Sequence, residues 1–180
     1  MPQNLAGELE NGGNVIILPT ANADQLTLFA KGEIDGAWAP EPWATRLILE
    51  AGGRVFLDEK TLWPNGQFVT THLIVSAKFL KENPKAVERL VRAEVKATQT
   101  INADPEKAKE TVNKGIEQLT GKALSKATID GAWKNLTFTY DPIASSLARS
   151  ATDAFDAGLL GRQAPNLKGI YALDSLNRVL

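Results

Sequence analysis

Hydrophobic positions in the first third of the chain alternate between short apolar runs and helical spacing. Residues 15–18 form a β-branched run after a glycine turn and predict a buried strand. The apolar positions that follow predict a helix, with Asn22 or Asp24 as its cap and an end at Gly32. A strand, a helix and a strand then repeat the pattern over 36–39, 42–51 and 54–58. Such alternation is typical of parallel strands joined by crossover helices, so the sequence predicts an α/β fold.

The pattern changes in the middle of the chain. Residues 59–67 predict a loop and residues 68–75 a long strand of β-favouring residues. Consecutive helices then follow over 84–101, 105–119, 125–133 and 143–155, with a short strand at 136–138 and a last short helix within 166–180. The change indicates a boundary between two lobes, so we expect β/α units followed by a helix-rich segment.

Composition narrows the class of protein. Hydrophobic residues make up 43% and charged residues 23% of the 180 residues, which is typical of soluble globular chains. The net charge of −1 gives no basic surface for nucleic acid or anionic lipid, and helix lysines such as Lys107 and Lys109 are interpreted as solvent-facing. No apolar run reaches the roughly 20 residues of a membrane span, and residues 1–5 lack the basic and apolar parts of a signal peptide.

Residue counts restrict the chemistry. The chain has no cysteine, which excludes disulfides, thiolate metal ligands and cysteine nucleophiles. Its single histidine, His72, cannot form a multi-histidine metal site, and any serine triad would have to use it. Enzymatic hypotheses therefore start at a disadvantage, and we expect no metal and no cofactor.

The segment 35–43 (DGAWAPEPW) is the strongest candidate for a binding site. It joins the end of a predicted parallel strand to the start of a helix, where open α/β sheets place ligands. A helix that begins at Pro42 offers free N–H groups and a positive dipole end to an anion. Trp38 and Trp43 would form aromatic walls, and Glu41 would accept hydrogen bonds from an amine or amide.

A structural interpretation of these residues stays open beside the functional one. In it, Trp43 packs in the core, Trp38 packs between strand and helix, and Glu41 complements the helix dipole. The sequence alone does not decide between the two.

The predicted strand 68–75 supplies a second set of candidates. Thr70, Thr71 and His72 could reach a cleft, although strand alternation places Thr70 and His72 on one face and Thr71 on the other. The alternative for His72 is a hydrogen-bonded, partly buried histidine. Trp63 and Asn65 in the preceding loop are candidates for the rim of a cleft, or else solvent-facing turn residues.

Linked motifs along the chain resemble one family. They are the run 31–46 (KGEIDGAWAPEPWATR), the glycines 52–53, the loop 62–66 (LWPNG) and the run 68–75 (FVTTHLIV). The likeness is to the nitrate/sulfonate/taurine-type substrate-binding proteins of ABC importers, and it continues through 79–84, 132–133, 158–160 and 173–180. The resemblance implies the type II periplasmic-binding fold, in which two α/β lobes close over a ligand and the closed form docks on a membrane permease.

The resemblance also implies a role for each part of the chain. Residues 1–67 would be the remainder of the second, ligand-cleft lobe, 68–76 the crossing strand, and 77–180 the helix-rich return to the first lobe. By this resemblance, the region that supplies most of the first lobe and the start of the second would be missing upstream, together with the export signal or lipid anchor of the family. We therefore expect a domain excised from a periplasmic or lipid-anchored surface protein, whose unpaired sheet edges would allow dimerisation.

These observations lead to one main hypothesis. We expect the ligand-binding component of an ABC importer, holding a small sulfonate-, taurine- or nitrate-like ligand with Trp38, Glu41, Trp43, Thr70, Thr71 and His72. The alternative is an enzyme or binding protein acting on thiamine-precursor pyrimidines, in which Glu41 and His72 would serve as acid and base. A helical interaction module over 77–180 is a third hypothesis, and it requires an exposed apolar patch.

Overall fold

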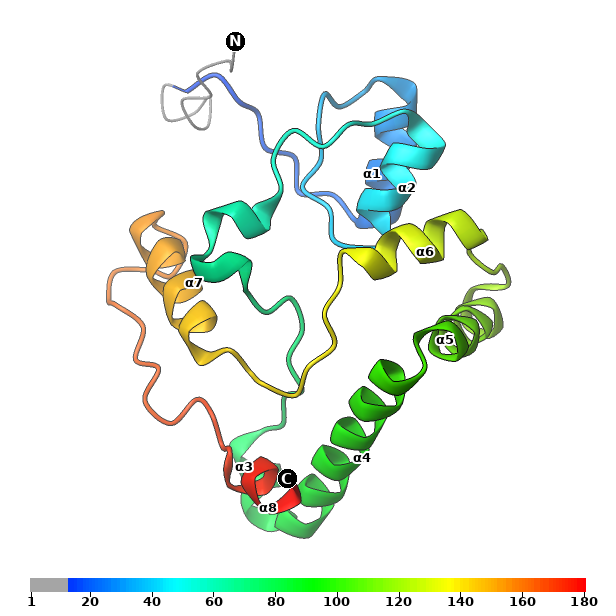
Figure 1. The fold of residues 1–180 in the computed structure, drawn as a ribbon. Helices are drawn as coiled ribbons and strands as arrows, with labels where there is room; N and C mark the ends of the chain where they lie inside the picture. Colours follow the sequence, from blue (N-terminus) through cyan, green and yellow to red (C-terminus); the bar gives the residue numbers. More distant parts are fainter. Residues whose placement is uncertain (1–12) are drawn as a thin grey trace. The chain divides into compact units, whose positions relative to one another are not determined.

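The computed structural model describes residues 13–180. Helices and the irregular segments between them make up these residues (Figure 1). The chain divides into two compact units, Met1–Arg54 and Val55–Leu180, and each is described by itself.

The first unit is built around two helices that pack on each other, α1 (Asn22–Lys31) and α2 (Trp43–Ala51). Each ends at a glycine in the left-handed conformation, Gly32 with φ 72° and Gly52 with φ 70°, as the sequence predicts. The first cap differs from the prediction, because Ala21 rather than a polar residue precedes α1. Leu47 of α2 is buried and supplies the core of this unit.

The second unit contains the remaining helices, several of which begin at the signals read from the sequence. Their bounds are η2 (Glu59–Leu62), η3 (Pro64–Gly66), α3 (Ala77–Glu82), α4 (Pro84–Ala103), α5 (Pro105–Thr120), α6 (Lys126–Lys134), α7 (Ala144–Asp156) and α8 (Asp174–Val179). Prolines occupy the first turns of α4 and α5, where their missing N–H groups have no helical partner to lose. Ser125 caps α6 by accepting a hydrogen bond from the Thr128 N–H at 3.1 Å.

The core of the second unit lies along α4. This helix packs against α8, α5 and α3, and α5 packs against α6. Val87, Val95 and Thr98 are buried on the predicted apolar face of α4, whereas Leu90 on the same helix is 47% exposed. Arg178 of α8 donates a hydrogen bond to Glu88 of α4 at 3.1 Å, and this bond adds a polar link to the packing of the two helices.

The predicted α/β fold is wrong. Within residues 13–180 the structure is helical and has no strand, and Val15 alone makes an isolated bridge. The segments 36–39, 54–58, 68–75 and 136–138, predicted as strands, are irregular.

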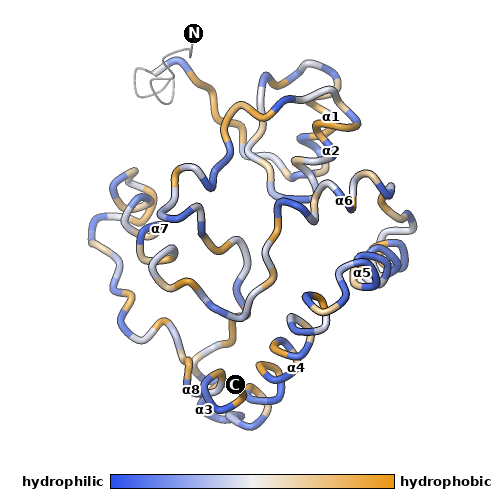
Figure 2. The backbone as a smooth tube through the Cα atoms, viewed as in Figure 1, coloured by the Kyte–Doolittle hydropathy of each residue, from blue (hydrophilic) through white to orange (hydrophobic). Residues whose placement is uncertain are grey.

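The physical reason is that a strand depends on a neighbour. Backbone N–H and C=O groups in a strand are satisfied by an adjacent strand, and β-propensity reports only which side chains suit a sheet. The apolar side chains of these segments remain outside the core, with Phe56 77% exposed and Ile74 83% exposed. Figure 2 shows hydrophobic residues on connecting segments as well as on helices.

The predicted lobe division at residues 68–76 stays a prediction. The chain boundary between the two compact units lies elsewhere, between Arg54 and Val55. None of the helices among residues 13–180 combines the length and the hydrophobicity that crossing a membrane requires.

Candidate functional site

Backbone N–H groups at the start of α2 already have hydrogen-bond partners within the chain. The Ala44 N–H donates to the Pro40 carbonyl at 3.1 Å, and the Arg46 N–H donates to the Pro42 carbonyl at 3.0 Å. Between them, the Thr45 N–H donates to the carboxylate of Glu41 at 3.1 Å. The Glu41 carboxylate therefore lies where the sequence predicts a bound anion, and an anion at this helix end would have to compete with it.

The two tryptophans of this segment have different surroundings. The guanidinium of Arg46 lies 4.6 Å from the ring centroid of half-buried Trp43. Glu50 holds that guanidinium with bonds of 2.8 and 2.9 Å, and these bonds raise the pKa of Arg46. Trp38 is 65% exposed, which does not fit the interpretation that it packs between a strand and a helix.

The single histidine of the chain contacts two residues that are distant from it in the sequence. His72 Nε2 is 3.2 Å from the carbonyl oxygen of Pro142 and 3.2 Å from the hydroxyl of Tyr171. A carbonyl oxygen can only accept, so the first contact requires a proton on Nε2. Burial raises the pKa of the Tyr171 hydroxyl. His72 is thus a partly buried, hydrogen-bonded histidine, as the structural alternative for it predicts.

Thr70 and Thr71, the neighbours of His72, are both exposed. Their segment is attached through Val69, whose N–H donates to the buried hydroxyl of Ser146 at 3.2 Å. That hydroxyl in turn donates to the Ile143 carbonyl at 2.9 Å. The two threonines therefore stand on a segment that α7 holds in place.

The predicted site residues fall into two groups. Trp38, Glu41 and Trp43 belong to the first unit, and Thr70, Thr71 and His72 belong to the second. The residues of each group are close in the sequence, and a shared cleft stays a prediction.

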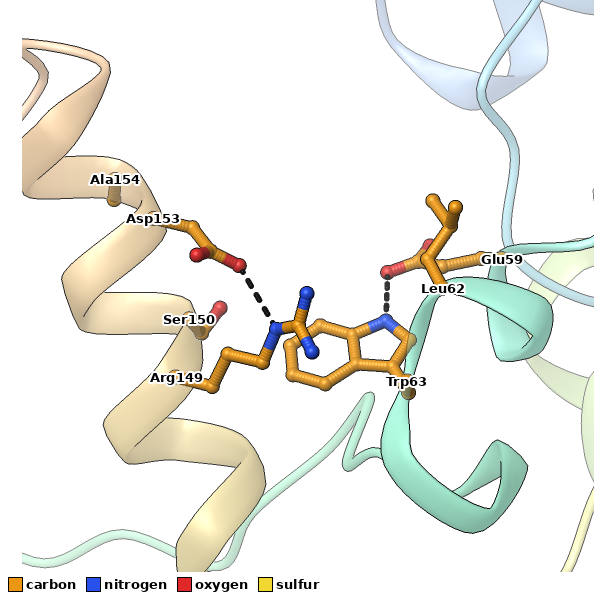
Figure 3. A pocket seen from close by; sticks show the side chains of 7 residues that line it. All are labelled: Glu59, Leu62, Trp63, Arg149, Ser150, Asp153 and Ala154. Carbon is orange, nitrogen blue, oxygen red and sulfur yellow. Dashed lines mark hydrogen bonds and ion pairs between the residues drawn. The ribbon is translucent and has the colours of Figure 1, made fainter.

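A cavity of about 450 Å³ lies within the second unit (Figure 3). Its walls come from η2 and the residue after it on one side and from α7 on the other (Figure 3). The lining residues are Glu59, Leu62, Trp63, Arg149, Ser150, Asp153 and Ala154. Its volume lies in the range of small-molecule sites, about 300–1,000 Å³.

Trp63 lines this cavity and contacts residues on both of its sides. Its ring stacks on Phe68 with centroids 5.3 Å apart and planes at 13°, and its N–H donates to Glu59 at 3.2 Å. The guanidinium of Arg149 lies 5.6 Å from the Trp63 ring centroid, and its Nε donates to Asp153 at 3.3 Å. The sequence identifies Trp63 as a rim candidate and misses Arg149 and Asp153. Their spacing of four residues marks them as a helix pair, but nothing in the sequence connects that pair to Trp63.

The NMT1-like family matches residues 4–114 of the chain, which is more than half of its length. The chain belongs to this family. No curated protein and no solved structure matches it.

Membership in the NMT1-like family fits the resemblance to nitrate/sulfonate/taurine-type substrate-binding proteins. It indicates a periplasmic-binding-type protein, and NMT1-like proteins are mostly substrate-binding proteins rather than enzymes. They typically act outside the cytoplasm and bind a small ligand. The matched range contains all six predicted site residues and Trp63, whereas Arg149 and Asp153 lie beyond it.

Acidic and histidine side chains do not gather into a metal site in the part of the chain that the structure describes. Within residues 13–180, no group of three or more such residues is arranged to hold a metal ion.

Proposed function

We propose that this NMT1-like chain is the ligand-binding component of an ABC importer and takes up a small sulfonate-, taurine- or nitrate-like molecule. The observation that carries the proposal is the start of α2, where the segment that contains exposed Trp38 leads into the carboxylate of Glu41 and the Trp43–Arg46 pair. A largely exposed aromatic side chain that is close in the sequence to charges of both signs is typical of a ligand site.

The charges at this site favour one type of ligand within that group. The Glu41 carboxylate repels a bare anion such as nitrate, and it attracts an ammonium or another donor. The guanidinium of Arg46, which lies against Trp43, suits a sulfonate or carboxylate, and such a group would compete with Glu50 for it. A molecule with both an amine and an acid group, as in taurine, therefore fits the α2 start better than a simple anion.

Thr70, Thr71 and His72 belong to the proposal as the contribution of the second unit. The exposed hydroxyls of Thr70 and Thr71 can donate hydrogen bonds to a ligand, and His72 holds their segment through the carbonyl of Pro142. In the importer, the ligand-bound form would dock on a membrane permease outside the cytoplasm.

Isothermal titration of the chain with taurine, ethanesulfonate and nitrate tests the proposal. Glu41→Gln keeps an oxygen that can accept from Thr45 but removes the charge, so the helix start should be preserved. We expect this variant to weaken taurine binding about tenfold or more and to leave ethanesulfonate binding unchanged or stronger. The matched control is Glu33→Gln, at an exposed acid just after α1. Equal effects of Glu41→Gln on both ligands would remove Glu41 from the site, and silence toward every ligand would contradict the proposed function.

The alternative function, chemistry on thiamine-precursor pyrimidines, has less support. It requires His72 as acid or base, but Nε2 of His72 is engaged by Pro142 and Tyr171. Turnover of such a pyrimidine, abolished by His72→Ala, would favour the enzyme instead.

A further inference from the structure

The cavity of the second unit presents an aromatic ring whose position is fixed. Phe68 covers a face of the Trp63 ring, and Glu59 holds the indole N–H. A ring that is fixed in this way loses little freedom when a ligand stacks on it. The Trp63 ring is therefore held in place before a ligand binds, and a ligand does not have to order it.

A cation already lies over this ring. The guanidinium of Arg149 extends from α7 to the Trp63 ring, as Figure 3 shows, with 5.6 Å between its central carbon and the ring centroid. The ring attracts positive charge through its quadrupole, and tryptophan does so most strongly among the aromatic side chains. The position over the ring is therefore one that a guanidinium or ammonium group fits.

Arg149 is weakly tethered in that position. Its partner Asp153 is one helical turn away, and the two side chains are 48% and 59% exposed. An exposed ion pair between residues i and i+4 contributes little free energy. A competing cation can therefore displace the guanidinium from the ring at small cost.

The charges and the size of the cavity indicate the kind of competitor. Glu59 and Asp153 carry two negative charges and Arg149 one positive charge, which leaves the lining with a net negative charge. The volume of about 450 Å³ exceeds that of a guanidinium alone, and Leu62 and Ala154 offer apolar surface. A ligand with one positive charge and a short apolar part satisfies both features.

We propose that the cavity between η2 and α7 binds a small organic cation, an ammonium or guanidinium compound, over the ring of Trp63. The bound cation takes the place of the Arg149 guanidinium, with Glu59 and Asp153 as its counter-charges. This proposal stands apart from the proposed function, because it uses none of the residues assigned to the ligand of the importer.

The direct test follows the indole N–H of Trp63 in ¹⁵N-labelled protein during titration with butylguanidinium. The signal is identified by its loss in Trp63→Phe. We expect a saturable shift of that signal with butylguanidinium. Butanesulfonate, which has the same apolar chain and the opposite charge, should leave it unchanged.

Two variants separate a cation site from an anion site. Arg149→Gln removes the competing charge from the ring, so the affinity for butylguanidinium should rise about three- to tenfold. Glu59→Gln should lower that affinity by a similar factor. Arg92→Gln is the matched control, because exposed Arg92 makes an equivalent pair with Glu88 at 3.3 Å on α4, and it should change nothing.

The proposal is overturned if butylguanidinium leaves the Trp63 signal in place. It is also overturned if butanesulfonate shifts that signal and Arg149→Gln abolishes the shift, because Arg149 would then be an anion ligand. Taurine titrations of Glu41→Gln and Arg149→Gln keep the two proposals distinguishable, since only the first variant should affect taurine.

Discussion

The ammonium group of Lys109 lies 2.6 Å from a carboxylate oxygen of Asp130, and this ion pair joins α5 to α6. Glu106 also approaches Lys109 at 2.6 Å, and Lys126 forms a further ion pair with Asp130. The Lys109 side chain is only 13% exposed, so its interpretation as a solvent-facing lysine is wrong. Hydrogen bonds from Lys109 and then from Lys126 lower the pKa of Asp130 to about 2.

The first prediction concerns acid stability. The folded pKa of Asp130 lies below its unfolded value of about 4, so its ion pairs stabilise the fold above that value. This contribution is lost as the pH falls toward 2. We expect Asp130→Asn to lower the free energy of unfolding at pH 7 and the difference from the unsubstituted chain to shrink between pH 4 and pH 2. Urea unfolding across that pH range measures the difference in the free energy of unfolding, and Asp156→Asn at an exposed position is the control. A difference that stays constant with pH would show that Asp130 acts through packing rather than charge.

The second prediction concerns the buried hydroxyl of Ser146. It accepts from the Val69 N–H and donates to the Ile143 carbonyl, so Ser146→Ala leaves both backbone groups without this partner. We expect a loss of about 1–3 kcal/mol in the free energy of unfolding, because a buried group that loses its partner keeps its desolvation cost. Amide exchange at Val69 should also become faster. Ser145→Ala on the exposed side of α7 should change neither quantity, and an equal effect of the two changes would refute the assignment.

The third prediction concerns the core along α4. Val95 is 5% exposed, and Val95→Ala removes two buried methyl groups and leaves a void. We expect a cost of about 2 kcal/mol from the lost transfer free energy and the cavity. Leu90→Ala removes more atoms from a side chain that is 47% exposed, yet it should cost less. Chemical denaturation of both variants tests the order, and a larger loss at Leu90 would place the core elsewhere.

The fourth prediction concerns the contact between Tyr171 and His72. Tyr171→Phe removes the hydroxyl that lies 3.2 Å from His72 Nε2 but keeps the ring. We expect a loss of about 0.5–1.5 kcal/mol, as for one hydrogen bond, while the bond from His72 to Pro142 persists. The His72 ring signals in NMR spectra should move without broadening. Broad signals would mean that the hydroxyl, rather than Pro142, fixes the ring.

Helices could be predicted from the sequence because their signals are local. Pro84, Asp104–Pro105 and Ser125 mark helix starts, and Gly32 and Gly52 mark helix ends, where the structure has them. Each of these signals acts within one turn of the chain. The sequence does not predict the short helix α3 or the 3₁₀ turns η2 and η3, because so few residues show little periodicity. It places the equally short α8 only within the wider range 166–180.

Strand formation could not be predicted in the same way, because a sheet depends on pairing between distant segments. The β-favouring run that contains His72 predicts a strand. In the structure, Val69 of this run hydrogen-bonds to Ser146, and His72 contacts Pro142 and Tyr171. The same limit applies to the candidate sites. Glu41, Pro42 and Trp43 are consecutive and were found together, whereas Trp63 and Arg149 lie 86 residues apart and no sequence pattern links them.

The exposed apolar segments have a consequence for the behaviour of the protein in solution. Phe56 and Ile74 belong to β-favouring stretches that lie outside the core, and such stretches pair readily with copies of themselves when charge repulsion is weak. The isoelectric point of about 5.9 lies close to neutral pH, so little repulsion opposes this pairing. Colloidal stability should therefore be lowest near pH 6, and light scattering should rise there with protein concentration and fall when either residue is replaced by lysine.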